Sequence, residues 1–361
     1  MRIPQEKESP PKPGTRMFAA MLIKNAHWNR VTASVLPVLI AATLIAGCGN
    51  QPNEPPSSGP APGVLRTPDA RFENMAGFDY APLYIDIPYQ GSALRMHYVD
   101  EGPKDAPVIL ALHGQGQWSY AYRDMIPIFL AAGYRVVAPD FIGFGRSDKL
   151  PNDTDYEFAD HVAWLTTFID QMDFDTEVTA FLFDWGGYFG LKIAADHPEY
   201  FDRLVLANTA LPKGYNGGSE FFKKWRAGIL ARPEFPMAQM VNEGVKIPLS
   251  DEAMRAYDAP YPDESYKAGP RRFPLILPIE DTDAAAPANK AAWGKLASYD
   301  KPTLTLYSKM FAKSDSLGPN PLIEHIPGAD GQPHAVIDAS FYIVDDASVE
   351  LAEKTVEFIG Q

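Results

Sequence analysis

The stretch from Glu177 to Ala195 constrains the fold of this chain more than any other part of the sequence. It reads Glu-Val-Thr-Ala-Phe-Leu-Phe-Asp184-Trp-Gly-Gly-Tyr-Phe-Gly-Leu-Lys-Ile-Ala-Ala. Its first part is apolar, β-branched and aromatic over the length of a strand, and its last part favours a helix that ends before Pro198. The Asp-Trp-Gly-Gly segment between them predicts a sharp turn with Asp184 at its tip.

A strand, a tight turn and a helix with a reactive side chain at the tip are typical of the nucleophile elbow of α/β-hydrolases. The usual serine is absent, and Asp184 stands in its place. A carboxylate there can attack carbon and form an ester intermediate, so Asp184 is the candidate nucleophile. Gly186 and Gly187 let the helix pack closely behind it. The alternative is that Asp184 only caps the helix that follows.

The rest of the chain alternates strand and helix patterns. With 361 residues, 46% of them hydrophobic, we expect one large α/β domain with an insertion. The alternation predicts the α/β-hydrolase fold, with a mostly parallel eight-stranded sheet and ligands at the carboxyl ends of its strands. Between Leu211 and about Ala288 the alternation stops, which predicts a helical cap after the sixth strand. The strands are predicted at Ile85–Gln90, Ala93–Val99, Ala106–Leu112, Tyr134–Pro139, Glu177–Phe183, Arg203–Ala207, Pro302–Ser308 and His334–Asp338, with a closing helix near Ser348–Ile359.

The N-terminal region has the pattern of a secretory leader. Residues 1–16 are polar and patternless and resemble an over-extended start, with Met17 or Met21 as the initiator. Basic residues then precede an apolar run that is too short for a transmembrane helix. The run ends in Leu44-Ile-Ala-Gly-Cys48, which resembles a bacterial lipobox with Cys48 as the lipidated residue; the alternative is a chance cysteine beside a signal peptide. Cys48 is the only cysteine, which excludes an intrachain disulfide.

These patterns predict a lipid-anchored protein of the cell envelope that faces the periplasm or the exterior. A stretch rich in Pro, Ser and Gly follows Cys48 and suits a flexible tether. The predicted organisation is a signal peptide with lipobox (1–48), a linker (49–72), a first core part (73–211), a cap (212–290) and a second core part (291–361).

The charge and the glycine pattern exclude two classes of partner. The whole chain has a formal charge of −14, and the part after Cys48 carries 26 Lys and Arg against 44 Asp and Glu. This acidity argues against nucleic acid and anionic membrane surfaces as partners. Gly143 and Gly145 lack the third glycine and the helix of a dinucleotide-binding motif, so no such cofactor is expected.

Five motifs are spread over the core and the cap. They are His113-Gly-x-x-x-Trp-Ser-Tyr, Pro139-Asp-Phe-x-Gly-Phe-Gly-x-Ser-Asp, Asp184-Trp-Gly-Gly, Phe222-Lys-Lys-Trp and Tyr257-Asp-Ala-Pro-Tyr-Pro-Asp-Glu-Ser-Tyr-Lys-Ala-Gly. With these motifs the chain resembles the haloalkane dehalogenases from about Tyr98 to Phe358, and its cap motifs resemble those of their first subfamily. The resemblance implies removal of halide from small apolar alkyl halides by an Asp nucleophile, without a metal or an organic cofactor. It implies that Trp185 and Trp225 bind the departing halide through their indole N–H groups, and that Gln115 contributes to the oxyanion loop.

The indole assignments are chemically reasonable, because an indole is a donor with an apolar body and suits an anion in a dry pocket. For Trp225 the alternative is simple core packing of a helical cap. Phe222, one turn before it, is either a wall of the pocket or part of the core.

The chain departs from this family at the base. The family has a His just after the last strand, in a Gly-His-Phe turn, and the corresponding residue here is Phe341. Of the later histidines, His325 and His334 are the only candidates, and His334 lies at the opposite end of that strand. His113 is near the pocket by motif, but the resemblance makes it a structural residue of its turn.

The acid of the triad also departs from the family pattern. The family's acid position after the seventh strand falls between Phe311 and Asp315, which makes Asp315 the candidate acid. The other family location holds Asn208, which cannot act as a carboxylate.

Three functions follow from these observations. The first is a hydrolytic dehalogenase with an unrecognised base. The second is an enzyme in which Asp184 displaces halide but the alkyl-enzyme does not turn over, because Phe341 excludes water and cannot activate it. The third is a pseudoenzyme, a lipoprotein that binds a small apolar ligand. An epoxide hydrolase would need the same missing His, and a serine hydrolase would need a Ser at the elbow. The sequence favours a hydrolase-family protein with impaired turnover.

Overall fold

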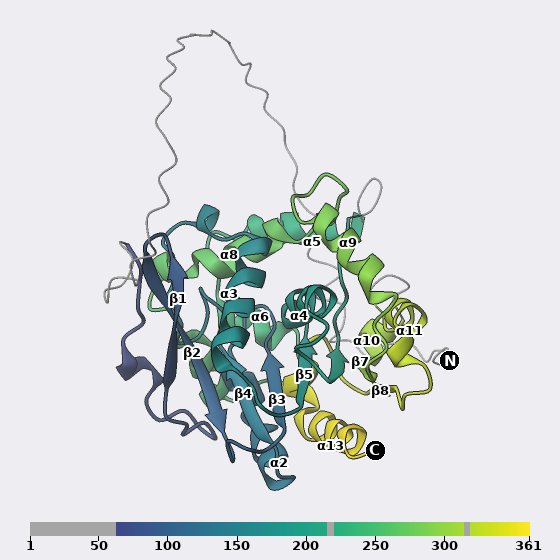
Figure 1. Ribbon diagram of the computed structural model, residues 1–361. Helices are drawn as coiled ribbons and strands as arrows, with labels where there is room; N and C mark the ends of the chain where they lie inside the picture. Colours follow the sequence, from purple (N-terminus) through teal and green to yellow (C-terminus); the bar gives the residue numbers. More distant parts are fainter. Residues whose placement is uncertain (1–62, 215–219, 314–317) are drawn as a thin grey trace, which may run out of the picture.

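An eight-stranded sheet forms the centre of the structure, a computed structural model that describes residues 63–214, 220–313 and 318–361. The strand order is β1-β2-β4-β3-β5-β6-β7-β8; β2 pairs antiparallel with β1 and β4, and every other neighbouring pair is parallel (Figure 1). This confirms the predicted α/β-hydrolase fold. The strands are β1 (Leu83–Tyr89), β2 (Ser92–Glu101), β3 (Val108–Leu112), β4 (Arg135–Pro139), β5 (Val178–Phe183), β6 (Arg203–Ala207), β7 (Thr303–Ser308) and β8 (Ala335–Ile337).

The central strands are buried on both faces and mostly apolar, because helices cover both sides of the sheet. Along β3, Val108, Leu110 and Leu112 pack into one core, whereas Ile109 and Ala111 pack into the other. This is the two-residue period of a strand. The first core includes side chains of α3 (Phe158–Met172), α4 (Trp185–Asp196), α9 (Ala286–Leu296) and α11 (Asn320–His325), and the second includes those of α2 (Ile126–Ala131), α12 (Ile343–Asp346) and α13 (Ser348–Ile359).

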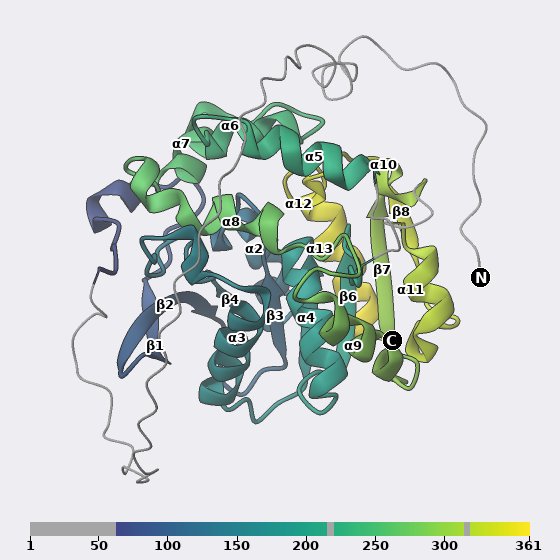
Figure 2. The ribbon, with the colours of Figure 1, turned by 90° about the horizontal axis from the view of Figure 1, so that it is seen from above.

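A helical cap lies between β6 and β7. Figure 1 places its helices above the carboxyl ends of β3 and β5, and Figure 2 shows them from above. Helix α9 packs against α4 of the core, so the cap ends near residue 285, slightly before the predicted boundary. The cap helices are α5 (Glu220–Leu230), α6 (Met237–Glu243), α7 (Asp251–Asp258) and α8 (Ala268–Ile276), and the short helix α10 (Lys309–Ala312) follows β7.

Short 3-10 helices occupy several connections. The segment after Gln115 forms only the single turn η2 (Ser119–Tyr122) before α2 begins. The others are η1 (Asp69–Phe72), η3 (Asp153–Asp155), η4 (Glu264–Lys267) and η5 (Pro327–Ala329).

Residues 63–72 pack on the folded domain, although the sequence places them in the flexible linker. Leu65 pairs with Lys149, and the guanidinium of Arg66 donates to both carboxylate oxygens of Asp148 at 2.7 and 3.0 Å. The Asp148 side chain is buried, and a buried carboxylate without a partner would destabilise the fold. The Arg66 guanidinium supplies the opposite charge. Residues 63–72 are therefore part of the folded domain, whereas the sequence predicts that the core starts at residue 73.

The leader lies outside the described residues, as do Cys48 and the linker up to residue 62. In the part of the chain that the structure describes, no helix has the length and apolarity needed to cross a membrane.

Candidate active site

Asp184 stands at the tip of a strained turn between β5 and α4. Its φ of 48° and ψ of −117° lie outside the regions that ordinary residues prefer. A Cβ on Gly186 would lie 2.1 Å from the carbonyl oxygen of Leu112, and one on Gly187 would lie 2.0 Å from Oγ1 of Thr209. Both positions therefore require glycine. The turn presents the Asp184 side chain at the carboxyl edge of the sheet, as the nucleophile elbow requires.

The Asp184 carboxylate is buried and receives backbone donors, and no cationic group in the described part of the chain pairs with it. Its Oδ2 accepts a hydrogen bond of 2.9 Å from the N–H of Gln115, and the N–H of Trp185 also donates to the side chain. Only 3% of Asp184 is exposed. Burial raises the pKa of the Asp184 carboxyl, and the hydrogen bonds from the two N–H groups lower it. Burial has the larger effect, and the pKa is about 7. The Gln115 N–H belongs to the segment that the family resemblance predicts as the oxyanion loop.

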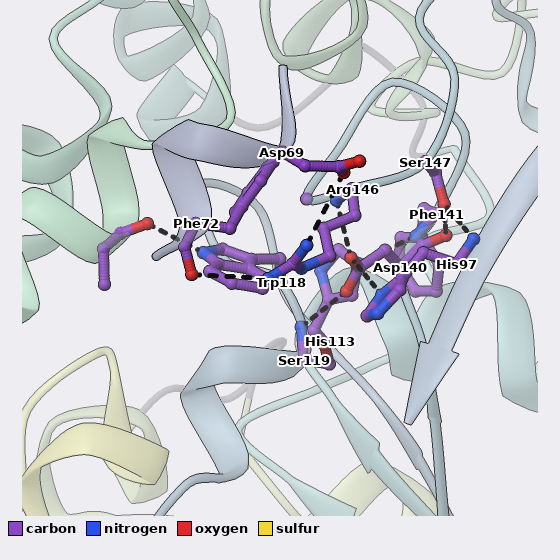
Figure 3. Close-up of polar contacts among 12 residues, drawn as sticks. Asp69, Phe72, His97, His113, Trp118, Ser119, Asp140, Phe141, Arg146 and Ser147 are labelled. Atoms are coloured by element: carbon purple, nitrogen blue, oxygen red, sulfur yellow. Dashed lines mark hydrogen bonds and ion pairs between the residues drawn. The ribbon is translucent and has the colours of Figure 1, made fainter. Parts of the chain in front are cut away.

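A buried aspartate, Asp140, links three separate segments of the chain (Figure 3). Asp140 accepts hydrogen bonds of 2.8 Å from the N–H of Ser119, from His97 Nδ1 and from the N–H of Arg146. Burial opposes the ionisation of Asp140, but its partners, His97 foremost, hold its pKa at about 2. Strand β2, the turn η2 and the loop after β4 are thus tied together through Asp140.

His113 is a structural residue, because both of its ring nitrogens are occupied. The N–H of Phe141 donates to Nε2 at 3.0 Å, so Nδ1 carries the proton and donates to the carbonyl of Gly114 at 2.9 Å. Burial lowers the pKa of this imidazole to about 4. His113 therefore cannot take a proton from a water near Asp184.

No other imidazole among the described residues hydrogen-bonds Asp184. His161 is buried among aromatic rings, and burial lowers its pKa to about 3. His334 precedes β8 and bonds to Thr305 and the carbonyl of Ala329, and His325 bonds to the carbonyl of Trp293. The remaining two form contacts with carboxylates away from the elbow: His97 with Asp140 and His197 with Glu199.

Phe341 lies in an aromatic group at the end of the sheet. Its ring centroid is 5.5 Å from that of Phe311, 6.5 Å from that of Phe183 and 4.7 Å from that of Tyr342. Phe311 belongs to α10, directly after β7. The loops after β7 and β8 therefore present phenyl rings to each other. The candidate acid Asp315 lies outside the described residues.

Asn208 ties three strand ends together. Its Nδ2 donates to the carbonyls of Ser340 and Phe341 at 3.1 and 2.9 Å, and its Oδ1 accepts from the N–H of Ser308 at 2.8 Å. A carboxylate at this position would face two carbonyl oxygens. Asn208 is therefore a structural bridge.

The two candidate halide-binding tryptophans have different surroundings. The Trp185 ring is buried against Phe273, with centroids 4.2 Å apart, and no described residue accepts a hydrogen bond from its indole N–H. Trp225, on α5, is partly buried and meets the ring of Phe222 edge-on at 6.3 Å. It also packs against the cap cluster formed by Ile229, Phe235, Met237 and Tyr261.

Three residues near the nucleophile were not predicted from the sequence. Phe273 packs on Trp185, the side chain of Gln115 donates to the carbonyl of Pro270 at 3.2 Å, and the Tyr342 hydroxyl donates to the carbonyl of Gln115 at 3.2 Å. Helix α8 thus lies over the site. In the described ranges, no group of three His, Cys, Asp or Glu residues could hold a metal ion.

Comparison with known proteins gives the same family throughout. Residues 107–241 match the model of the alpha/beta hydrolase fold. The chain is 44% identical over 299 residues to a haloalkane dehalogenase of Mycobacterium marinum, covering 82% of this chain and 99% of the relative. It is 46% identical over 299 residues to haloalkane dehalogenase 1 of Mycobacterium tuberculosis, covering 82% and 98%. The solved structure of the tetrameric haloalkane dehalogenase DpaA from Paraglaciecola agarilytica is 34% identical with a TM-score of 0.73, covering 81% and 97%.

The buried carboxyl gives a first test, which needs no substrate. Below its ordinary pKa of 3.8 Asp184 is neutral in both states; between 3.8 and about 7 the unfolded chain ionises while the folded protein keeps its proton. The folded state thus loses stability as pH rises through this window. We expect Asp184→Asn to stabilise the protein by up to about 4 kcal/mol above neutral pH and by much less near pH 4. Denaturant unfolding of both proteins across this range measures the difference, and a difference independent of pH would contradict the raised pKa.

Proposed function

Because this chain belongs to the haloalkane dehalogenase family, we propose that Asp184 displaces halide from small alkyl halides to give an alkyl-enzyme ester, and that hydrolysis of this ester is weak or absent. The observation that carries the proposal is the carboxylate at the strained turn. It has two N–H donors, whereas no imidazole in the described part of the chain reaches it.

In the first step a carboxylate oxygen of Asp184 attacks the carbon that bears the halogen. The new C–O bond forms as the carbon–halogen bond breaks, and the halide leaves with the bonding electron pair. The indole N–H groups of Trp185 and Trp225 are the proposed donors to this anion, in a site walled by aromatic rings.

The burial of Asp184 favours ester formation. Attack requires the ionised carboxylate, and a pKa of about 7 leaves a substantial ionised fraction at neutral pH. The ester is neutral, so alkylation removes a charge that the buried site holds at a cost. The alkylated state is therefore stable unless a base delivers water.

No such base is evident among the described residues. At position 341 the family resemblance expects His, whereas Phe341 packs on Phe311 and cannot accept a proton. Both nitrogens of His113 are already bonded. Water near the ester would thus have neither an acceptor for its proton nor a polar group at 341 to hold it.

Two alternative functions remain open. A fully hydrolytic dehalogenase is favoured by the names of the relatives, and it would require a base that we have not recognised. A ligand-binding lipoprotein would use the same apolar site without chemistry.

We expect one equivalent of bromide per protein when the domain is incubated with excess 1-bromobutane or 1,2-dibromoethane. The protein should gain the mass of one alkyl group on Asp184, because the ester has no base to release it. Bromide assay and intact-mass spectrometry measure both, with Asp184→Asn as the control that releases none. Many equivalents would indicate hydrolysis, and neither bromide nor adduct would leave only the binding function.

Phe341→His should increase turnover, because an imidazole at that position could activate water. A carboxylate partner strengthens such a base, so Phe311→Asp with Phe341→His should exceed the single variant, since the two rings are neighbours. Steady-state bromide release measures the gain. If neither variant exceeds the one-equivalent burst of the parent protein, position 341 does not face the ester.

We also propose that Cys48 carries the lipid that attaches the protein to a bacterial membrane. The support is the sequence Leu-Ile-Ala-Gly-Cys48 after a short apolar run. We expect a radiolabelled fatty acid to be incorporated in bacterial cells and to be lost in Cys48→Ser. Equal labelling of the variant would overturn this assignment.

A further inference from the structure

The turn after β8 places a phenol against the oxyanion loop. The Tyr342 hydroxyl donates to the carbonyl of Gln115 at 3.2 Å. The backbone N–H of Gln115 in turn donates to the Asp184 carboxylate. We propose that Tyr342 is a positioning residue, whose hydroxyl holds the peptide after Gln115 so that the Gln115 N–H stays aimed at the nucleophile.

The loop needs such a restraint because Gly116 follows Gln115. Gly116 has a φ of +80°, and without a Cβ it leaves the preceding peptide free to rotate. A Cβ built on it would lie 3.3 Å from the Tyr342 hydroxyl oxygen and 3.3 Å from Cγ2 of Val241. The Tyr342 hydroxyl thus lies next to Gly116, the residue at which the loop backbone can rotate most freely.

Tyr342 itself is held firmly. Its N–H donates to the carbonyl of Gly244 at 3.1 Å, and its carbonyl accepts from the N–H groups of Asp345 and Asp346 at 3.0 and 3.1 Å. A Cβ on Gly244 would lie 2.7 Å from the Tyr342 ring, so the ring rests directly on that backbone. Because backbone contacts fix both ends of Tyr342, its hydroxyl can act as a fixed donor.

Asp184 is the group that should report the loss of this donor. The Gln115 N–H bond lowers the pKa of Asp184 against the effect of burial, and no charged group contributes to that balance. The titratable neighbours that Asp184 influences are Tyr122 and Tyr342, and burial raises the pKa of both phenols, so they stay neutral. A loosened Gln115 N–H should therefore raise the pKa of Asp184.

A second phenol provides a matched control. The Tyr257 hydroxyl is buried and donates to Asp345 at 2.8 Å, without touching the carbonyl of Gln115. Asp345 in turn accepts from Gln117 at 2.6 Å, so Tyr257 supports the same region through other bonds. Tyr257→Phe removes an equivalent hydroxyl and should reduce stability without changing the nucleophile.

The test compares Tyr342→Phe and Tyr257→Phe in the full domain. Infrared titration of the Asp184 carboxyl, assigned by difference from Asp184→Asn, should show a midpoint about half to one pH unit higher in Tyr342→Phe and unchanged in Tyr257→Phe. Tyr342→Leu, which also lacks the hydroxyl, should show the same shift and replaces Tyr342→Phe if that variant folds poorly. An unchanged midpoint in folded variants at position 342 would overturn the proposal.

A rate measurement on the same variants rests on the proposed alkylation. Single-turnover bromide release by Tyr342→Phe should fall about threefold to tenfold near pH 6 and recover near pH 9, where Asp184 is ionised in both proteins. An equal loss at both pH values would contradict an effect through the nucleophile's ionisation. If no protein releases bromide, the proposed function fails, and the infrared midpoint still decides the role of Tyr342.

Discussion

A carboxylate buried without a cation is the constraint on which the rest of this structure depends. Asp184 stands on a backbone conformation that is strained, and its charge is opposed by burial and relieved only by two N–H groups. The surrounding architecture holds those donors in place. Asp140 ties η2, which follows the loop of Gln115, to β2. Tyr342 donates to the carbonyl of Gln115, and α8 contacts the Gln115 side chain through Pro270.

The sequence predicted the parts of the molecule that local pattern determines. The apolar runs of β3 and β5 follow from burial on both faces, and the Asp-Trp-Gly-Gly turn follows from the two places where a Cβ would clash. The eight-stranded, mostly parallel sheet was predicted because strand and helix patterns alternate along the chain. The inserted cap was predicted because this alternation stops between Leu211 and about Ala288.

The features that the sequence did not predict are contacts between residues far apart in the chain. Gln115 meets Pro270 and Tyr342 across 155 and 227 residues, and no spacing in the sequence indicates those bonds. The boundary at residue 72 failed for a related reason. Proline and glycine content suggested a tether, whereas the partner of Arg66 is Asp148, 82 residues away. Composition describes a segment's own flexibility and carries no information about such partners.

The close packing behind the nucleophile has a consequence for how this fold changes its chemistry. Gly186 and Gly187 lie against Leu112 and Thr209 with no room for a side chain, and backbone hydrogen bonds hold the same turn, so its course is fixed by groups other than the Asp184 side chain. The residue at the apex contributes its reactive group but is not needed to keep that course. A lineage can therefore exchange one attacking atom for another, a carboxylate oxygen for a hydroxyl or a thiol, by altering a single codon while the sheet and helix stay where they are.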